Sequence, residues 1–227
     1  MHFDKPHFPW NAPVAFVGRY ADRVHLPVFD PEYLVRAVLF VQAAAPGSPH
    51  RYAGNRYSTN DHARTLAAYY GCVTWVDDAI GRLLAMIDYL GLQNETLVIY
   101  TSDHGDMLGY HGLWQKTVFF ESSSQLLVRD PGIGRHVRVS DPVGHIDLFP
   151  TVCKVLNLPT PNDLDGVSLQ PVFNGRALAR DAIFSESVVL KQPERAGCMI
   201  RTGRFKYNRY LDESDGRRPE RGIVAHS

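Results

Sequence analysis

The chain has few cysteines, no net charge and no long apolar segment. Its 227 residues include only Cys72, Cys153 and Cys198. Three scattered cysteines predict no disulfide framework, and the lack of a Cys-x-x-Cys pair argues against a structural zinc site. Lys plus Arg and Asp plus Glu both number 24, which argues against a chain that mainly binds nucleic acid or anionic membrane. No segment approaches the about 18 consecutive apolar residues of a membrane-spanning helix.

The composition is otherwise that of an ordinary globular chain, and one short segment is its most informative feature. Hydrophobic residues make up 44% of the sequence, which is enough for a core. The β-branched and aromatic run at residues 96–101 predicts a strand. Residues 102–112 follow directly and read Ser-Asp-His-Gly-Asp-Met-Leu-Gly-Tyr-His-Gly. The change predicts a loop at the carboxyl edge of a sheet, where open α/β folds bind ligands.

This loop contains donors for a metal ion and groups that can neutralise an anion. Asp103 and His104 place an oxygen donor beside a nitrogen donor, a pair that suits a divalent metal. His111 and, beyond the loop, Lys116 supply basic groups. Taken singly, an Asp-His-Gly is also typical of a polar turn, and Lys116 of a surface lysine. Three glycines let the backbone bend and approach a ligand; they are Gly105, Gly109 and Gly112.

The whole constellation resembles the metal-site segment of the sulfatase family, within the alkaline phosphatase superfamily. Members carry Ser-Asp-His/Asn-Gly, then Gly-x-His-Gly, then Lys. The resemblance implies that Asp103 and His104 are metal ligands. It also implies that Lys116 is a catalytic residue that binds the sulfate or phosphate group and that His111 contributes to substrate binding. The motif Gly-Asp-Met-Leu-Gly most resembles that of choline sulfatases and phosphonate monoester hydrolases.

The resemblance extends along most of residues 1–210. Residues 5–9, Lys-Pro-His-Phe-Pro, resemble a family segment whose His contacts the sulfuryl group or assists its departure. This implies a catalytic role for His7 and a substrate-binding role for Lys5, although a histidine packed in a loop is the simpler alternative. Three downstream segments match an Ile-Asp-x-x-Pro-Thr helix start, an Asp-Gly-x-Ser-Leu turn and a C-terminal strand pair. They are residues 144–152, 165–169 and 200–207.

Two family features are missing from the sequence. The family's nucleophile lies in Cys/Ser-x-Pro-x-Arg and is oxidised to formylglycine, but none of the three cysteines here precedes such a proline. The early Asp-Asp metal pair is also missing, since Asp77-Asp78 falls in a helical pattern and is interpreted as helix surface. We therefore expect the chain to be the C-terminal portion of a sulfatase-type protein.

The sequence predicts an α/β fold, a partial sulfatase-type sandwich with a mostly parallel sheet flanked by helices and a small C-terminal antiparallel sheet. Residues 1–175 are expected to form the C-terminal part of the catalytic domain, and 176–227 a subdomain with antiparallel strands and a frayed end. Periodicity predicts helices at 61–90 and 145–157 and an antiparallel hairpin at 198–210. Further strands are predicted at 96–101, 125–129, 138–140 and 182–185, and a loop at 41–58.

The apolar face expected for the long helix carries residues three or four apart, which are Leu66, Tyr70, Val73, Val76, Ile80, Leu83, Ile87 and Leu90. Asp61 or Asn60 is expected to cap its start, and Gly91 to end it. Gly71 and Gly81 are interpreted as points where the helix packs closely on the sheet.

Three functions remain open at this stage. The first is a metal-dependent hydrolase of small sulfate esters, with calcium the first choice of metal and manganese or magnesium the alternatives. The second is a phosphonate monoester or phosphodiester hydrolase of the same superfamily, and the third is a non-catalytic remnant of the fold. No nucleic acid and no membrane span are expected. An unpaired sheet edge predicts association with further copies of the chain or with a missing N-terminal half.

Overall fold

The computed structural model describes residues 1–27, 58–110, 119, 126–132, 138–178, 180–189, 192–210 and 223–225. They belong to two compact units, Met1–Pro131 and Gly132–Ser227, which are described separately. Of the predicted loop at 41–58, only Ser58 is described. The expected domain division at residues 175 and 176 stays a prediction. Among the described helices, none is both long and apolar enough to cross a membrane.

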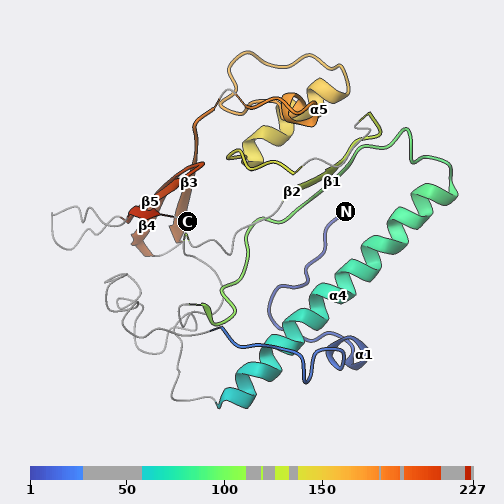
Figure 1. Cartoon of the computed structure of the whole chain (residues 1–227), viewed down its shortest axis with the longest axis vertical. Coiled ribbons are helices and arrows are strands. Elements are labelled where there is room, and N and C mark those ends of the chain that lie inside the picture. The colour runs from blue at the N-terminus through green and yellow to red at the C-terminus, as the bar shows by residue number, and fades with distance from the viewer. Residues whose placement is uncertain are drawn as a thin grey trace. The chain divides into compact units, whose positions relative to one another are not determined.

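Helix α4, Thr59–Tyr89, is the longest element of the first unit (Figure 1). Its cap is Ser58, which corrects the expectation of Asn60 or Asp61. The Ser58 hydroxyl accepts from the Asp61 amide at 3.1 Å, and the Asp61 carboxylate accepts from the Ser58 amide at 2.9 Å. The Ser58 hydroxyl, which also donates to this carboxylate, lowers the pKa of Asp61. Gly91 follows the helix with φ of 72°, as predicted for a terminating glycine.

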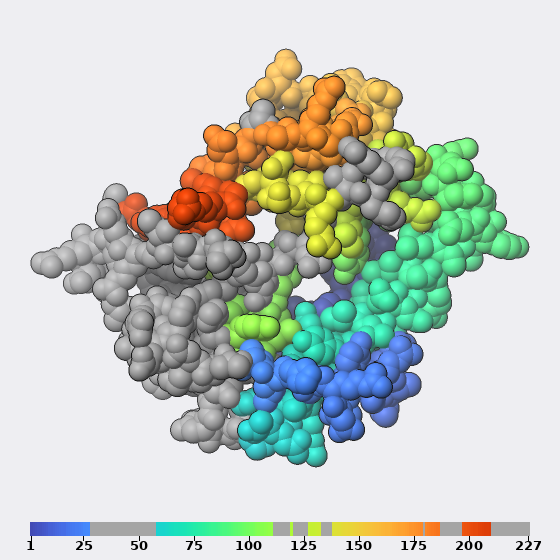
Figure 2. Space-filling model, viewed as in Figure 1, coloured from blue at the N-terminus to red at the C-terminus, as the bar shows by residue number. Residues whose placement is uncertain are grey.

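The buried face of α4 agrees with the predicted one at Leu66 and Val76 and differs from it at four other positions. Tyr70, Val73, Leu83 and Leu90 are exposed. The second half of the helix contributes to the surface seen in Figure 2. Asp77 and Asp78 are exposed, as predicted. The buried positions lie in the first half of the helix; they are His62, Leu66, Ala67, Gly71, Cys72 and Val76.

The face is rotated because the short helix α1, Val14–Val17, packs against α4 (Figure 1). A Cβ built on Gly71 would lie 3.0 Å from the backbone of Val17. Gly71 thus permits close packing on α1, whereas the sequence analysis expected the sheet. A Cβ built on Gly81 would have no atom of the described residues within 4 Å, so the expectation that Gly81 packs closely on the sheet was wrong.

Strand β1, Val98–Thr101, pairs antiparallel with β2, Leu126–Arg129. Both strands were predicted, but a mostly parallel sheet is not shown by the described residues, in which this unit has a two-stranded sheet. The side chains of β1 are only partly buried, and Tyr100 is exposed. Outside the sheet, Arg129 contacts Asp88 of α4 at 3.5 Å.

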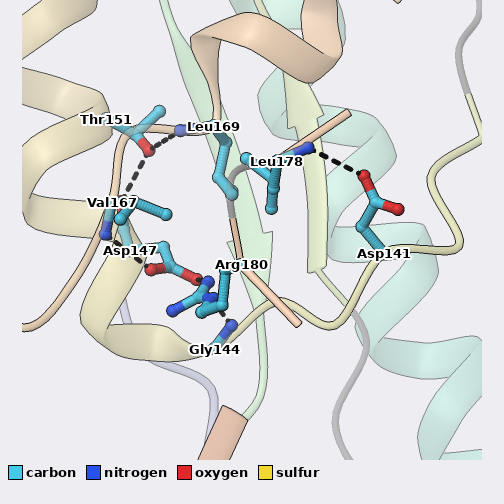
Figure 3. A network of polar contacts seen from close by, with 8 residues as sticks. All are labelled: Asp141, Gly144, Asp147, Thr151, Val167, Leu169, Leu178 and Arg180. Carbon is cyan, nitrogen blue, oxygen red and sulfur yellow. Dashed lines mark hydrogen bonds and ion pairs between the residues drawn. The ribbon is translucent and has the colours of Figure 1, made fainter. Parts of the chain in front are cut away.

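The second unit joins two of the predicted family segments through buried polar contacts (Figure 3). The 3-10 helix η2, His145–Asp147, leads into α5, Leu148–Val155, and α6 follows at Gln170–Phe173. The fully buried Asp147 accepts from the amides of Gly144 at 2.8 Å and Val167 at 2.9 Å, and pairs with Arg180. The Thr151 hydroxyl accepts from the Leu169 amide at 2.8 Å.

This network joins the helix start at residues 144–152 to the turn at residues 165–169. A Cβ on Gly166 would stand 2.0 Å from the carbonyl oxygen of Ile146, so only glycine fits there. Asp147 stabilises the start of η2 through its bond to the Gly144 amide. Its pairing with Arg180 was not predicted. A further contact joins the Leu178 amide to the Asp141 carboxylate at 3.1 Å.

The C-terminal antiparallel sheet has the strand order β3-β4-β5-β6. Its strands are Ala182–Val189, Gln192–Thr202, Phe205–Tyr210 and Ile223–Ala225. The predicted hairpin is present, with Arg201 opposite Lys206 and Gly203 in the turn. The strand predicted at 138–140 is not formed, because these exposed residues have no strand partner among the described residues.

The two helical glycines give a matched test of the α1–α4 contact. Both substitutions with alanine gain about 0.5–1 kcal/mol of helix propensity. Gly81→Ala should therefore raise the free energy of unfolding, whereas Gly71→Ala should lower it because the new methyl meets the Val17 backbone. Urea unfolding of both variants measures the difference. Equal stabilisation by the two substitutions would contradict the close packing.

The buried pair of Asp147 and Arg180 gives a second prediction. Arg180→Met leaves the fully buried Asp147 without its cation, which should cost about 3–5 kcal/mol of stability. Arg176→Met, at an exposed arginine nearby in sequence, is the control and should change stability little. Calorimetric unfolding of both variants decides, and equal melting temperatures would show that the ion pair stabilises nothing.

Candidate functional site

The loop after β1, residues 102–110, is called the Asp103 loop and presents the two predicted metal ligands. The Asp103 side chain is 85% exposed and that of His104 is 41% exposed. The Asp103 carboxylate accepts from the His104 amide at 2.9 Å through Oδ1, and its Oδ2 lies 3.3 Å from His104 Nε2. The two donors therefore face each other at the end of the strand.

The protonation of His104 follows from its second contact. Nδ1 lies 2.8 Å from the Gly105 carbonyl oxygen, and a carbonyl can only accept, so Nδ1 carries the proton. In the neutral ring, the lone pair is then on Nε2, which faces Asp103 Oδ2. Histidines that bind metals commonly donate their other N–H to a backbone carbonyl in this way. The contact orients the ring as a metal ligand requires.

The spacing of the two donor atoms also fits a shared divalent ion. Ligand atoms at about 2.1–2.5 Å from one ion, at right angles, stand about 3.0–3.5 Å apart. The observed 3.3 Å lies in this range. The set is only partial, however, because the described residues contain no group of three or more His, Cys, Asp or Glu side chains able to hold a metal. Asp103 and His104 thus fit two positions of a larger coordination shell.

The rest of the loop is shaped by one buried side chain and one tight turn. Met107 is buried and its carbonyl accepts from the Tyr110 amide at 2.8 Å. Leu108 and Gly109 have φ of 48° and 91°, so the turn requires the flexibility predicted for this glycine. The Asp106 carboxylate accepts from the Leu108 amide at 3.1 Å, a local bond typical of aspartate in turns.

The His7 segment, residues 4–10, holds its own conformation through contacts within the segment. His7 Nδ1 lies 2.6 Å from the Phe8 carbonyl oxygen, so this nitrogen also carries a proton and Nε2 remains for a ligand. The His7 amide donates to the Asp4 carbonyl at 2.9 Å. Lys5 Nζ donates to the Pro9 carbonyl at 2.5 Å, and its role in substrate binding stays a prediction.

The His7 segment packs against one face of α4. Trp10 packs its ring edge to face against Tyr69 of α4, with centroids 6.2 Å apart. Three residues further on the helix, and therefore on the same face, the buried Cys72 interacts with Lys5 and with the backbone of residues 11 and 12. Helix α4 thus supports the His7 segment of the candidate site.

Burial changes the acid–base properties of both helix residues. It raises the pKa of Tyr69 to about 12, and the negative charge of Asp106 contributes in the same direction. It also raises the pKa of the Cys72 thiol, an effect that the nearby Ala12 backbone partly offsets. Both groups are therefore neutral at physiological pH.

Two predicted residues, His111 and Lys116, lie outside the described residues. The packing of Tyr69 on the His7 segment was not predicted from the sequence; its ring contacts those of Trp10 and Tyr70.

Comparison with known proteins identifies the family. The family model named Sulfatase matches residues 1–158. The chain belongs to the sulfatase family. A choline-sulfatase of Rhizobium meliloti (strain 1021) is 30% identical over 221 residues, which cover 91% of this chain and 41% of that protein. Arylsulfatase K of Bos taurus is 32% identical over 170 residues, covering 69% and 31%.

A solved structure agrees with this family. The phosphonate monoester hydrolase from Silicibacter pomeroyi superposes with a TM-score of 0.78 at 26% identity, covering 97% of this chain and 48% of that one. The fold is therefore of the sulfatase type. The chain spans less than half the length of these relatives.

The raised pKa of Tyr69 predicts an alkaline loss of stability. The phenol titrates near pH 10 in an unfolded chain and at about pH 12 in the folded one. Its stabilising contribution is therefore complete below pH 10 and is lost as the pH rises from 10 towards 12. The difference in unfolding free energy between the wild type and Tyr69→Phe should change between pH 9 and 11 in urea titrations. A constant difference would contradict the burial of this hydroxyl.

Proposed function

We propose that this chain supplies the metal-binding and anion-binding part of a metal-dependent hydrolase of small sulfate esters. The observation that carries the proposal is the paired donor arrangement of Asp103 and His104 at the end of β1. The family model that matches residues 1–158 includes both the His7 segment and these two donors, which supports a common site.

Asp103 and His104 would hold the divalent metal through Oδ2 and Nε2. When bound, such an ion stabilises negative charge on the oxygens of the transferred group. Calcium favours oxygen ligands and takes about 6–8 of them, so further ligands are required beyond these two residues. Manganese or magnesium is the alternative, and His104 favours an ion that accepts nitrogen.

His7 would exchange a proton at Nε2. The Phe8 carbonyl keeps the proton of Nδ1 in place, so only Nε2 is available to a substrate. A protonated ring would donate from Nε2 to the departing alkoxide and return to the neutral form, the work of a general acid. Lys116 and His111 would bind the anionic group, and Lys5 would support substrate binding. The attacking nucleophile would be a water molecule, since the sequence lacks the formylglycine motif.

A second candidate is hydrolysis of phosphonate monoesters or phosphodiesters. It is supported by the similarity to the phosphonate monoester hydrolase, which extends over 97% of this chain. Sulfate and phosphonate esters share an anionic group and a departing alkoxide, so the same residues would serve both. A non-catalytic remnant that binds metal weakly is the third reading of the site.

The test measures metal binding and turnover separately. Calcium, manganese and magnesium are titrated calorimetrically into the wild type, Asp103→Ala and His104→Ala. Each ligand substitution should weaken binding at least about tenfold. The exposed His25→Ala variant is the control and should bind as the wild type does. Unchanged affinity in the two ligand variants would contradict the metal site.

Turnover is measured with 4-nitrophenyl sulfate, a 4-nitrophenyl phosphonate monoester and bis(4-nitrophenyl) phosphate, with and without EDTA. The sulfate ester should be the best substrate, and His7→Ala should lower kcat by about 100-fold or more. A preference for the phosphonate ester would favour the second candidate. Metal binding without turnover of any ester would favour the non-catalytic remnant.

A further inference from the structure

We propose that Lys5 is a positioning residue that orients the imidazole of His7. The inference rests on the proposed function, because His7 is the residue assigned there to protonate the departing alkoxide. Lys5 does not contact the ester in this arrangement. Its ammonium group instead donates to two main-chain carbonyls of its own segment, and these stand on either side, in sequence, of the carbonyl that holds the His7 ring.

Three successive carbonyl groups of the His7 segment accept hydrogen bonds from two side chains. The carbonyls of His7 and Pro9 accept from Lys5 Nζ at 3.4 Å and 2.5 Å. The Phe8 carbonyl between them accepts from His7 Nδ1 at 2.6 Å. Bonds from a charged donor are stronger than those from a neutral one, so the ammonium group restrains the peptide groups before and after the Phe8 carbonyl. The direction of this carbonyl, and with it that of the imidazole, therefore depends on Lys5.

The remaining contacts hold the segment at its ends, and packing contributes little at His7 itself. The His7 amide donates to the Asp4 carbonyl at 2.9 Å. Trp10 packs on Tyr69 of α4, and the Phe8 ring meets that of Trp10 with centroids 5.6 Å apart. Phe8 is nevertheless 56% exposed, and His7 is exposed as well. Because burial does not fix the ring of His7, its orientation rests on the hydrogen bonds of the neighbouring carbonyls.

The same contacts distinguish an indirect role of Lys5 from direct binding of the ester. A lysine ammonium group has three donors and no acceptor, and two of the donors of Lys5 are directed at carbonyls of its own segment. The side chain thus folds back on the main chain, and Lys5 is partly buried while His7 is exposed. Lys5 therefore supports substrate binding, the role assigned to it above, through the imidazole that it orients.

The experiment removes the ammonium group and records the protonation of the His7 ring. The whole chain is compared as wild type, as Lys5→Met, which keeps the apolar stem, and as Lys5→Arg, which keeps a charged donor. Lys154→Met, at an exposed lysine of α5, is the matched control. Nitrogen NMR of the His7 ring without ligand at about pH 9, where histidine is ordinarily neutral, reports which nitrogen carries the proton. Lys5→Gln, which also removes the charge, replaces Lys5→Met if that variant does not fold.

The expected result is the loss of a single tautomer. In the wild type and in Lys154→Met, the proton stays on Nδ1 of His7. Lys5→Met transfers part of the population to the form protonated at Nε2, because the Phe8 carbonyl is no longer held towards the ring, and Lys5→Arg retains most of the Nδ1 form. A wild-type spectrum of the His7 ring in the folded Lys5→Met or Lys5→Gln variant would overturn the proposal. A mixture of both tautomers in the wild type would do the same.

Kinetics with 4-nitrophenyl sulfate add a readout that a merely structural role would not move. Lys5→Met should lower kcat about tenfold to 100-fold with KM nearly unchanged, because misplacement of a catalytic group affects the transition state most. The double variant with His7→Ala should be no slower than His7→Ala alone, since Lys5 acts through that ring. A raised KM with unchanged kcat, or additive losses, would show instead that Lys5 contacts the ester. If the wild type turns over no ester, the proposed function fails while the tautomer of His7 still decides the role of Lys5.

Discussion

The packing of other segments on the first half of α4 is the constraint on which the first unit depends. Gly71 lets α1 approach to backbone contact, and the buried Cys72 lies under the backbone that follows the His7 segment. The ring of Tyr69 packs against that of Trp10. The helix therefore sets the relative position of segments that are too exposed and too irregular to fix themselves.

The second unit depends on a different interaction, a buried carboxylate surrounded by donors. Asp147 accepts hydrogen bonds from two backbone amides and forms an ion pair with the Arg180 guanidinium. One turn later, the Thr151 hydroxyl accepts a hydrogen bond from a third amide. These bonds join the start of α5 to the turn at residues 165–169 without a large apolar core. A buried charge of this kind fixes one arrangement because every alternative leaves it unpaired.

Local features of the fold could be predicted because they depend on neighbouring residues. The strand before Asp103, the end of α4 at Gly91 and the hairpin around Gly203 follow from runs of β-branched residues and from glycine. The buried face of α4 could be predicted only in part, at Leu66 and Val76, because the packing of α1 on Gly71, which lies 54 residues after Val17, also decides it. The cap at Ser58 was missed because Asp61 is an equally good capping residue in isolation. For the site, the roles of Asp103, His104 and His7 stay predictions from sequence motifs, whereas the packing of Tyr69 on Trp10 depends on a contact that no sequence pattern displays.

His7 and His104 share the contact that decides which ring nitrogen carries the proton. In each, Nδ1 bonds to a main-chain oxygen of the next residue, so the choice of tautomer is made within two residues of sequence. The location of each ring in space depends instead on elements far away along the polypeptide. Evolution of such a molecule could thus relocate an imidazole by altering distant packing while its reactive nitrogen stayed the same.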